Sequence, residues 1–383
     1  MLLIRNADVY APEHLGICDV LCEGEKIIRI GRVPDAYASL PECGVIDAEG
    51  RTLVPGYIDI HEHITGGGGE GGPTTRVPEA PLSCLIRSGV TTVVGLLGTD
   101  GITRSPENLL AKARSFNEEG ITCYILTGSY GYPPVTITGS VEKDLVLIDL
   151  CIGVKTAASD HRSSNITAEE LIRLGTEARR GGMLAGKAGF VTIHMGSGSA
   201  GIRPLFDAAE HSDLPMRILL PTHMGRTSQL IEEGIRWIAM GGNIDITAGD
   251  DEESNRSCAD KIIHVLDNGG ESHLTVSSDG FGSMPKFNEK KELIGLTYST
   301  PESLHQLLRI LVGEKLVPLE KALKLLTSNP ADILTVSERK GHIREAADAD
   351  LILYDQDMNI DTVIARGRIA MQSKEVLMKG RFE

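Results

Sequence analysis

Val54-Pro-Gly-Tyr-Ile-Asp-Ile-His-Glu-His63 is a short apolar run that ends in two histidines. It is the first of eight such runs, and each of the others also ends in a polar residue: 91–99, 122–127, 151–155, 191–194, 219–223, 243–247 and 274–279. Amphipathic stretches separate them, and those at 106–118, 168–179 and 229–240 predict helices. Eight strands alternating with helices predict an α/β fold, a TIM-like (β/α)8 barrel, with its active site at the carboxyl ends of the strands.

The two ends of the chain have a different pattern. Short β runs at 2–4, 18–22, 26–31 and 45–47 are separated by turn residues, and a β pattern returns from Gly341 to the C-terminus. We therefore expect residues 1–53 and 340–383 to form one small β-sandwich domain, with residues 54–339 forming the catalytic barrel.

Composition restricts the function classes. The chain of 383 residues has 38 Lys and Arg against 53 Asp and Glu, a net charge of −15, which argues against a nucleic-acid or anionic-membrane surface. The seven cysteines are scattered without a Cys-x-x-Cys pair, as is typical of a reduced compartment. With no signal peptide and no run of the roughly 18 apolar residues that a membrane helix needs, the sequence predicts a cytoplasmic protein.

A set of metal-ligating side chains falls at the predicted strand ends. His61 and His63 are two residues apart, so they lie on the same side of the first strand. His194, His223 and Asp279 end later strands. Imidazole and carboxylate ligands hold Zn²⁺ and similar ions, and a barrel mouth brings residues that are distant in sequence together. Histidines at strand ends can instead be satisfied by backbone hydrogen bonds, but five ligands at four such ends favour a binuclear metal site.

Lys155 ends the fourth predicted strand. An ammonium group has no acceptor and cannot ligate a metal. Carboxylated by CO2, however, the same nitrogen would carry two oxygens, one for each of two ions. The alternative is a lysine whose head reaches solvent.

These residues resemble the amidohydrolase superfamily, and within it the bacterial isoaspartyl dipeptidases. The resemblance spans nearly the whole chain, from Val54-Pro-Gly to Lys340-Gly-His-Ile and Ala349-Asp-Leu-Ile-Leu353. The most specific motifs are Gly66-Gly-Gly-Gly-Glu-Gly-Gly-Pro-Thr-Thr-Arg76, Val94-Gly-Leu-Leu-Gly-Thr-Asp100, Thr138-Gly-Ser-Val-Glu-Lys-Asp144, Ser159-Asp-His-Arg-Ser163 and Ser278-Asp-Gly280.

The resemblance implies a hydrolase of β-aspartyl dipeptides with two Zn²⁺ ions per subunit. Carboxylated Lys155 and a hydroxide nucleophile would bridge the ions, and Asp279 would act as general base and then general acid. Tyr130 would lie close to the scissile carbonyl, although Tyr132 is a second candidate. The other substrate-binding residues that the resemblance implies are Gly68, Glu70, Thr99 and Ser283 near the amino end, and Arg162 and Arg226 at the carboxylates. The resemblance also implies a homo-oligomer, an octamer being one candidate.

Three other functions fit parts of the sequence. Gly66, Gly68 and Gly71 match the spacing of a dinucleotide-binding loop, but Pro73 follows where that site needs a helix. A cyclic-amide hydrolase of the dihydroorotase or hydantoinase type would share every metal residue, yet its substrate has no α-amine for Glu70 to bind. A non-catalytic scaffold of the same fold would have no need for all six ligand positions.

Overall fold

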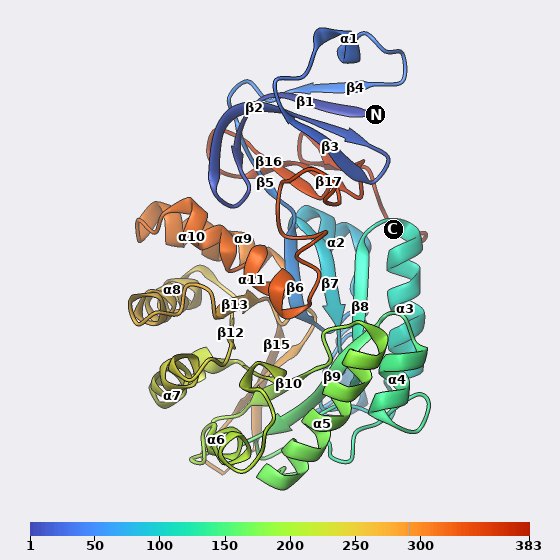
Figure 1. Cartoon of the computed structure of the whole chain (residues 1–383). Coiled ribbons are helices and arrows are strands. Elements are labelled where there is room, and N and C mark those ends of the chain that lie inside the picture. The colour runs from blue at the N-terminus through green and yellow to red at the C-terminus, as the bar shows by residue number, and fades with distance from the viewer. Residues whose placement is uncertain (291) are drawn as a thin grey trace.

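The computed structural model describes residues 1–290 and 292–383. Six parallel strands lie side by side in chain order (Figure 1): β6 (Tyr57–Glu62), β7 (Val90–Gly95), β8 (Thr122–Gly128), β9 (Cys151–Ala158), β10 (Phe190–Met195) and β11 (Leu219–Thr222). A parallel pair follows, β12 (Ile244–Thr247) and β13 (Leu274–Ser277). After β13 the chain runs beside β6. There the Asp279 amide donates to the His61 carbonyl at 3.1 Å, and the His63 amide donates to the Gly280 carbonyl at 2.8 Å. These bonds join the last strand of the barrel to the first.

Helices cover the outside of the strands, as the alternating pattern predicts. They are α2 (Leu82–Arg87), α3 (Pro106–Glu119), α4 (Val141–Leu147), α5 (Ala168–Ala185), α6 (Arg203–Glu210), α7 (Ser228–Ala239), α8 (Glu252–Asp267), α9 (Glu302–Arg309), α10 (Leu319–Lys324) and α11 (Ser328–Ile333). Helix α3 begins after Ser105, whose hydroxyl accepts from the Asn108 amide, and α5 begins with a capping box between Thr167 and Glu170.

Two elements are shorter than the sequence predicts. The strand expected over 91–99 ends at Gly95, and the chain then bends so that an added Cβ at Gly98 would lie 3.0 Å from Cε1 of His63. The helix expected over 301–312 is regular only to Arg309 and continues as a π-helical turn, Ile310–Glu314. The early bend after β7 places Thr99 on a loop over the barrel mouth.

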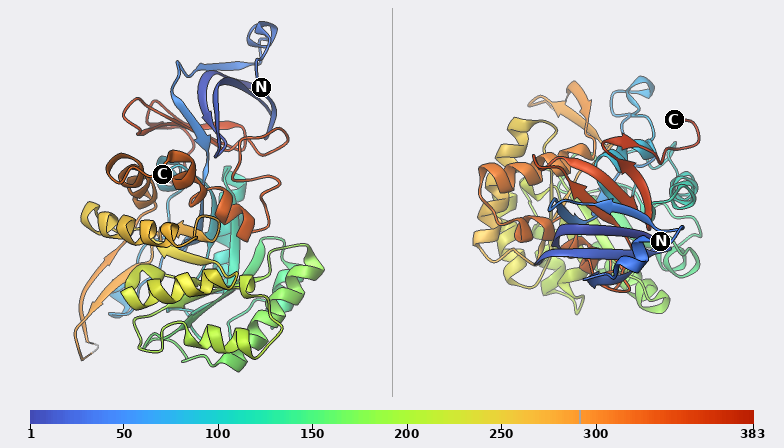
Figure 2. Two further views of the ribbon diagram at one scale, coloured as in Figure 1. Left: turned by 60° about the vertical axis from the view of Figure 1, so that its left-hand side comes forward. Right: turned by 90° about the horizontal axis from the view of Figure 1, so that it is seen from above.

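A nine-stranded sheet is built from both ends of the chain (Figure 2). Its strands are β1 (Leu2–Tyr10), β2 (His14–Glu23), β3 (Lys26–Gly31), β4 (Gly44–Asp47), β5 (Thr52–Pro55), β16 (Leu351–Tyr354), β17 (Ile360–Ala365), β18 (Arg368–Gln372) and β19 (Glu375–Val376). Strand β16 pairs antiparallel with β5, which joins the two chain ends. The first strand, expected over 2–4, extends to Tyr10. The predicted fold class, a barrel with a small β domain from both termini, is confirmed.

The end of the barrel at which the strands begin is closed by apolar side chains. Ile58, Phe190 and Leu220, near the starts of their strands, share a buried cluster with Ala331 of α11 and with Leu334. Because this end is filled, polar groups that must meet a substrate are confined to the opposite end, where the strands finish.

Candidate active site

A histidine and aspartate group lies at the carboxyl end of the barrel, where β6 and β13 finish side by side. The Nε2 atoms of His61 and His63 lie 3.5 Å and 3.1 Å from Oδ1 of Asp279. The ligating atoms of these three residues are all within 4.8 Å of one another, and all three side chains are buried. Two imidazoles therefore converge on one carboxylate oxygen.

The other three predicted ligands adjoin this group. Lys155, on β9, places Nζ 3.0 Å from Nε2 of His61. The ring of His223 lies 4.9 Å from that of His61 and 4.5 Å from that of His194, measured between centroids. The structure thus brings together all six residues that the sequence predicts as ligands, from strands up to 218 positions apart.

Burial sets the protonation of the cluster. It lowers the pKa values of His61, His194 and His223 well below the ordinary range, and the nearby cations Lys155 and Arg226 reinforce the effect. Burial also lowers the pKa of Lys155 to about 7, against the attraction of Asp279 and Asp245. These three imidazoles are therefore uncharged at neutral pH, which is the form that binds metal, and Lys155 has a substantial neutral fraction there.

The chemistry of the cluster fits a divalent cation. Among the described residues, Oδ1 of Asp279 and Nδ1 of His61 and His63 are buried without a hydrogen-bond partner. Buried polar atoms are almost always paired, and nitrogen and carboxylate donors that converge in this way suit Zn²⁺ or a similar ion. The backbone is strained at the same place, since His223 and Asp279 have φ values of 61° and 52°.

Glu70 is the centre of a second group beside the histidines. Its Oε1 accepts hydrogen bonds from Ser283 at 2.8 Å and Thr99 at 3.2 Å, and Nη1 of Arg162 lies 3.4 Å away. The Glu70 side chain is only 7% exposed, and its Oε2 has no hydrogen-bond partner among the described residues. A buried carboxylate with one free oxygen is suited to bind a cationic ligand group.

The glycine-rich loop that carries Glu70 is folded tightly against the barrel. Gly68 has φ of 83°, and an added Cβ would lie 2.4 Å from the Thr75 carbonyl, so only glycine fits there. The Gly67 amide donates to the Phe281 carbonyl at 2.8 Å, which ties the loop to the segment after β13. The buried guanidinium of Arg104 donates to the carbonyls of Thr65, Gly67 and Val77. Sequence reasoning missed Arg104, because an isolated arginine before a helix gives no motif.

Tyr130 and the two predicted arginines surround His194. The Tyr130 hydroxyl lies 2.6 Å from Nδ1 of His194, while Arg226 Nη1 lies 2.9 Å from Nε2 and donates to the Met195 carbonyl at 2.7 Å. Arg162 stacks over the Tyr130 ring at 5.3 Å. Tyr132 is directed elsewhere and packs against the hydrophobic core.

Asp160 connects these groups and was not singled out from the sequence. Its carboxylate accepts two hydrogen bonds from the Arg162 guanidinium, at 2.8 Å and 3.0 Å, and one from the Arg162 amide at 2.9 Å, and it lies 2.9 Å from Nε2 of His194. Burial opposes its ionisation, but His194 and Arg162 outweigh it and hold the pKa of Asp160 well below its usual range. The residue was visible in Ser159-Asp-His-Arg-Ser163, yet only the fold places it between two predicted site residues.

Two further carboxylates lie within the barrel below the cluster. Asp59 accepts from the His61 amide at 3.1 Å and from the Ser278 hydroxyl, and burial raises its pKa to about 7. Asp245 accepts from Thr222 and Ser277, both at 2.6 Å, and burial raises its pKa to about 6. Asp59 could have been predicted from the sequence, because it is spaced two residues before His61 and so lies on the same side of the strand as His61 and His63.

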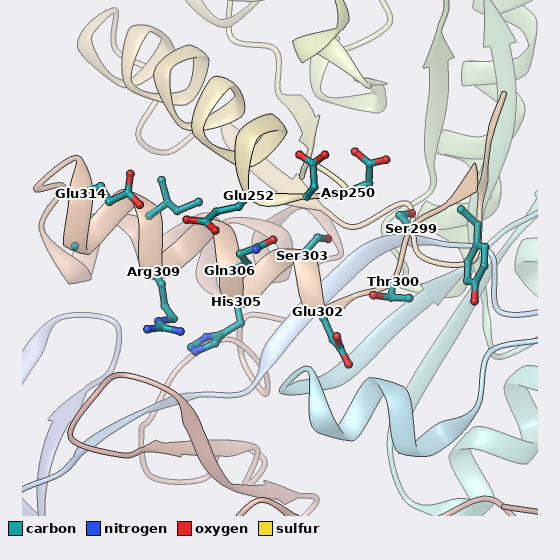
Figure 3. A pocket seen from close by; sticks show the side chains of 14 residues that line it. Asp250, Glu252, Ser299, Thr300, Glu302, Ser303, His305, Gln306, Arg309 and Glu314 are labelled. Atoms are coloured by element: carbon teal, nitrogen blue, oxygen red, sulfur yellow. The ribbon is translucent and has the colours of Figure 1, made fainter. Parts of the chain in front are cut away.

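The cluster opens into a cavity of about 540 Å³, whose lining includes Asp160, Arg162, His223, Arg226 and Asp279. A larger hollow of about 1110 Å³ lies between α8 and α9 (Figure 3). Its described lining mixes acidic residues, such as Glu252, Glu302 and Glu314, with uncharged polar ones and Arg309, and includes none of the predicted ligands. The smaller cavity is therefore the candidate active site, because predicted metal ligands and both predicted arginines line it.

The barrel and its mouth define an enzyme class, hydrolases that work at the carboxyl ends of parallel strands with histidine and aspartate ligands. The sequence pattern of the amidohydrolase family matches residues 52–370, and the chain belongs to that family. Among solved structures, the β-aspartyl dipeptidase of Fervidobacterium islandicum AW-1 in complex with β-Asp-Leu is 46% identical, with 98% of each chain covered and a TM-score of 0.92. The resemblance to isoaspartyl dipeptidases is confirmed.

Two other similarities are more distant. The dihydroorotase of Streptococcus pyogenes is 32% identical over 128 residues, so the match spans 32% of this chain and only 28% of that enzyme. The dihydropyrimidinase of Brevibacillus agri shares the fold, with 17% identity, a TM-score of 0.68 and 99% and 96% of the two chains covered. No helix in the part of the chain that the structure describes could span a membrane.

Proposed function

We propose that this enzyme hydrolyses the β-peptide bond of β-aspartyl dipeptides. The observation that carries the proposal is the buried Glu70 carboxylate, held by Thr99 and Ser283 next to the histidine cluster. A β-aspartyl dipeptide has a free α-amine, and Glu70 supplies the countercharge for it. The similarity to a β-aspartyl dipeptidase over 98% of the chain supports the same substrate class.

The two arginines complete the substrate site. Arg226 presents a planar guanidinium group, which matches a carboxylate in a bidentate arrangement. Arg162, whose Nε and Nη2 donate to Asp160, adds a second positive charge at the cavity. A β-aspartyl dipeptide carries an α-carboxylate and a terminal carboxylate, one for each arginine. Both arginines line the cavity that opens from the cluster. In the proposed complex the substrate amide would lie between Glu70 and Arg226.

Two Zn²⁺ ions would be held by His61, His63, His194, His223, Asp279 and a carboxylated Lys155. The lowered pKa of Lys155 favours that modification, because the neutral amine attacks the carbon of CO2, forms the N–C bond and releases a proton. When bound, the two ions supply a water nucleophile of lowered pKa at neutral pH.

The side chains perform the remaining steps. Asp279 takes the proton of the attacking water and passes it to the departing amine, as general base and then general acid. The Tyr130 hydroxyl, beside His194, donates to the oxyanion that develops on the amide carbonyl. Burial raises the pKa of Tyr130 above its ordinary value, so the phenol keeps its proton for this role.

A cyclic-amide hydrolase is the second candidate, and the partial match to a dihydroorotase favours it. A cyclic ureide has no amine to pair with Glu70, whose carboxylate would then be buried without a ligand cation. A scaffold protein is the third, and it would purify without stoichiometric metal.

The deciding experiment compares hydrolysis of β-Asp-Leu, α-Asp-Leu and dihydroorotate by one zinc-reconstituted preparation with bicarbonate present. We expect cleavage of β-Asp-Leu alone. Turnover of dihydroorotate instead would keep the metal site and reject the dipeptide, and no turnover would favour the scaffold. The domain limits at residues 53 and 340, the cytoplasmic location and the homo-oligomer are further proposals that rest on the sequence.

A further inference from the structure

One face of helix α8 forms a wall of the active-site cavity. Ser254, Cys258 and Lys261 all line it, and their spacing of four and three residues places them on the same side of the helix. Glu70, by contrast, is not part of this wall. Because Glu70 is the proposed site of the substrate amine, we expect the C-terminal residue of the dipeptide to lie along this wall.

Lys261 is the cation of this wall. Its Cδ would lie 3.9 Å from a Cβ added at Gly225, so its stem runs beside the backbone of the residue that precedes Arg226, and Arg226 and Lys261 line the same cavity. The side chain is half-buried. Among the residues that the structure describes, no carboxylate lies within 4.0 Å of the Lys261 ammonium.

The acidic groups that line the same cavity are engaged with other partners. Asp160 is bound by Arg162 and His194, and Asp279 faces His61 and His63. Asp250 is exposed at the mouth, where its Oδ1 accepts from the Ser254 hydroxyl at 3.2 Å. An ammonium that lines a binding cavity without a paired carboxylate is available to an anionic ligand group.

We propose that Lys261 binds the side chain of the C-terminal residue and makes the enzyme prefer β-aspartyl dipeptides that end in an acidic residue. This inference rests on the proposed dipeptidase function and deepens it. Arg226 takes the terminal carboxylate, which every dipeptide has. Lys261, on the adjoining α8 wall, takes a second carboxylate, which only dipeptides ending in aspartate or glutamate have.

The test compares kcat/KM for β-Asp-Glu with that for β-Asp-Gln, two substrates of nearly the same size that differ in charge. It uses the zinc-loaded wild type, Lys261→Met and the control Lys143→Met, which removes the same charge from an exposed site outside the cavity. We expect wild type and control to prefer β-Asp-Glu by about tenfold, the order of one charge-assisted hydrogen bond, and Lys261→Met to lose that preference. Lys261→Glu should reverse the charge preference and favour β-Asp-Lys over β-Asp-Glu.

Two results would overturn the assignment. An unchanged Glu to Gln ratio in Lys261→Met would show that Lys261 does not contact the side chain. An equal loss for β-Asp-Glu, β-Asp-Gln and β-Asp-Leu would show that it binds the shared terminal carboxylate instead. Salt provides a measurement on the wild type alone, because the preference for β-Asp-Glu should fall as ionic strength rises. A wild type that cleaves no β-aspartyl dipeptide would reject the dipeptidase function itself, which separates that failure from a failure at Lys261.

Discussion

The Ser283 hydroxyl donates a 2.8 Å hydrogen bond to the Glu70 carboxylate, and the two residues are 213 positions apart in the chain. Ser283 opens the hairpin strand β14 (Ser283–Phe287), which follows the last barrel strand, and Glu70 lies on the loop after the first. Closure of the barrel is what makes them neighbours. The same closure places Asp279 next to His61 and His63. The proposed amine site and the proposed metal site therefore both depend on the contact between the first and last strands of the barrel.

Removing the charge of Glu70 should weaken substrate binding. We expect Glu70→Gln to lower kcat/KM for β-Asp-Leu by about 100-fold, because the substrate ammonium would lose a buried partner. Steady-state kinetics measure this. Glu79→Gln, at a carboxylate that is about half exposed and paired with Lys112, is the matched control and should change little. Equal kinetics for both variants would remove Glu70 from the amine site.

The metal ligands should govern both metal content and turnover. We expect Asp279→Asn to reduce turnover by about 10³-fold or more, because general acid and base catalysis and a ligand are lost together. Bound zinc per subunit, measured by elemental analysis after reconstitution, should be close to two in the wild type and lower in the variant. Full turnover in Asp279→Asn would contradict the mechanism.

Lys155 should react with CO2 in a pH-dependent manner. Burial lowers its pKa to about 7, so the neutral, nucleophilic amine gains population as the pH rises through that value and loses it as the pH falls. We expect a carbamate signal in ¹³C NMR with labelled bicarbonate to grow between about pH 6 and pH 8. The signal should be missing from Lys155→Ala, and its presence there would assign the modification to another amine.

Arg226→Lys should mainly raise KM. A lysine keeps the positive charge but replaces a planar fork by a point charge, so we expect KM for β-Asp-Leu to rise about tenfold with a smaller change in kcat. Arg203→Lys, at a largely exposed arginine near Asp207, is the control. An unaltered KM in Arg226→Lys would end its role in substrate binding.

A buried ion pair should hold the barrel and the terminal sheet together. The Lys340 ammonium is 1% exposed and lies 2.5 Å from Asp350, 3.0 Å from Asp348 and 2.8 Å from the Thr122 hydroxyl of β8. We expect Lys340→Met to lower the free energy of unfolding by about 3–5 kcal/mol, since it leaves the buried Asp350 carboxylate without its cation, while Asp348 keeps Lys26 and Arg339. Urea unfolding measures this, with the exposed Lys379→Met as control.

The stabilisation by this ion pair should be lost at low pH, when Asp348 is protonated. Burial opposes ionisation of Asp348, but Lys340 and Lys26 outweigh it and lower its pKa to about 2. A depressed carboxyl pKa gives stability that is complete above about pH 4, the unfolded value, and is lost as the pH falls toward 2. The difference in the free energy of unfolding between wild type and Lys340→Met should therefore become smaller as the pH falls from about 4 toward 2. A constant difference between them down to pH 2 would contradict this assignment.

The sequence by itself determined the barrel and most of the ligand set. Strand periodicity, the histidines at strand ends and Lys155 are local features, and parallel strands of a barrel must bring their carboxyl ends together. Only the tertiary structure showed that Asp160 lies between Arg162 and His194, that Arg104 holds the glycine loop, and that Lys261 lines the cavity. Their positions depend on how loops and helices pack over the barrel mouth, and such packing is fixed by contacts between distant segments that no local pattern records.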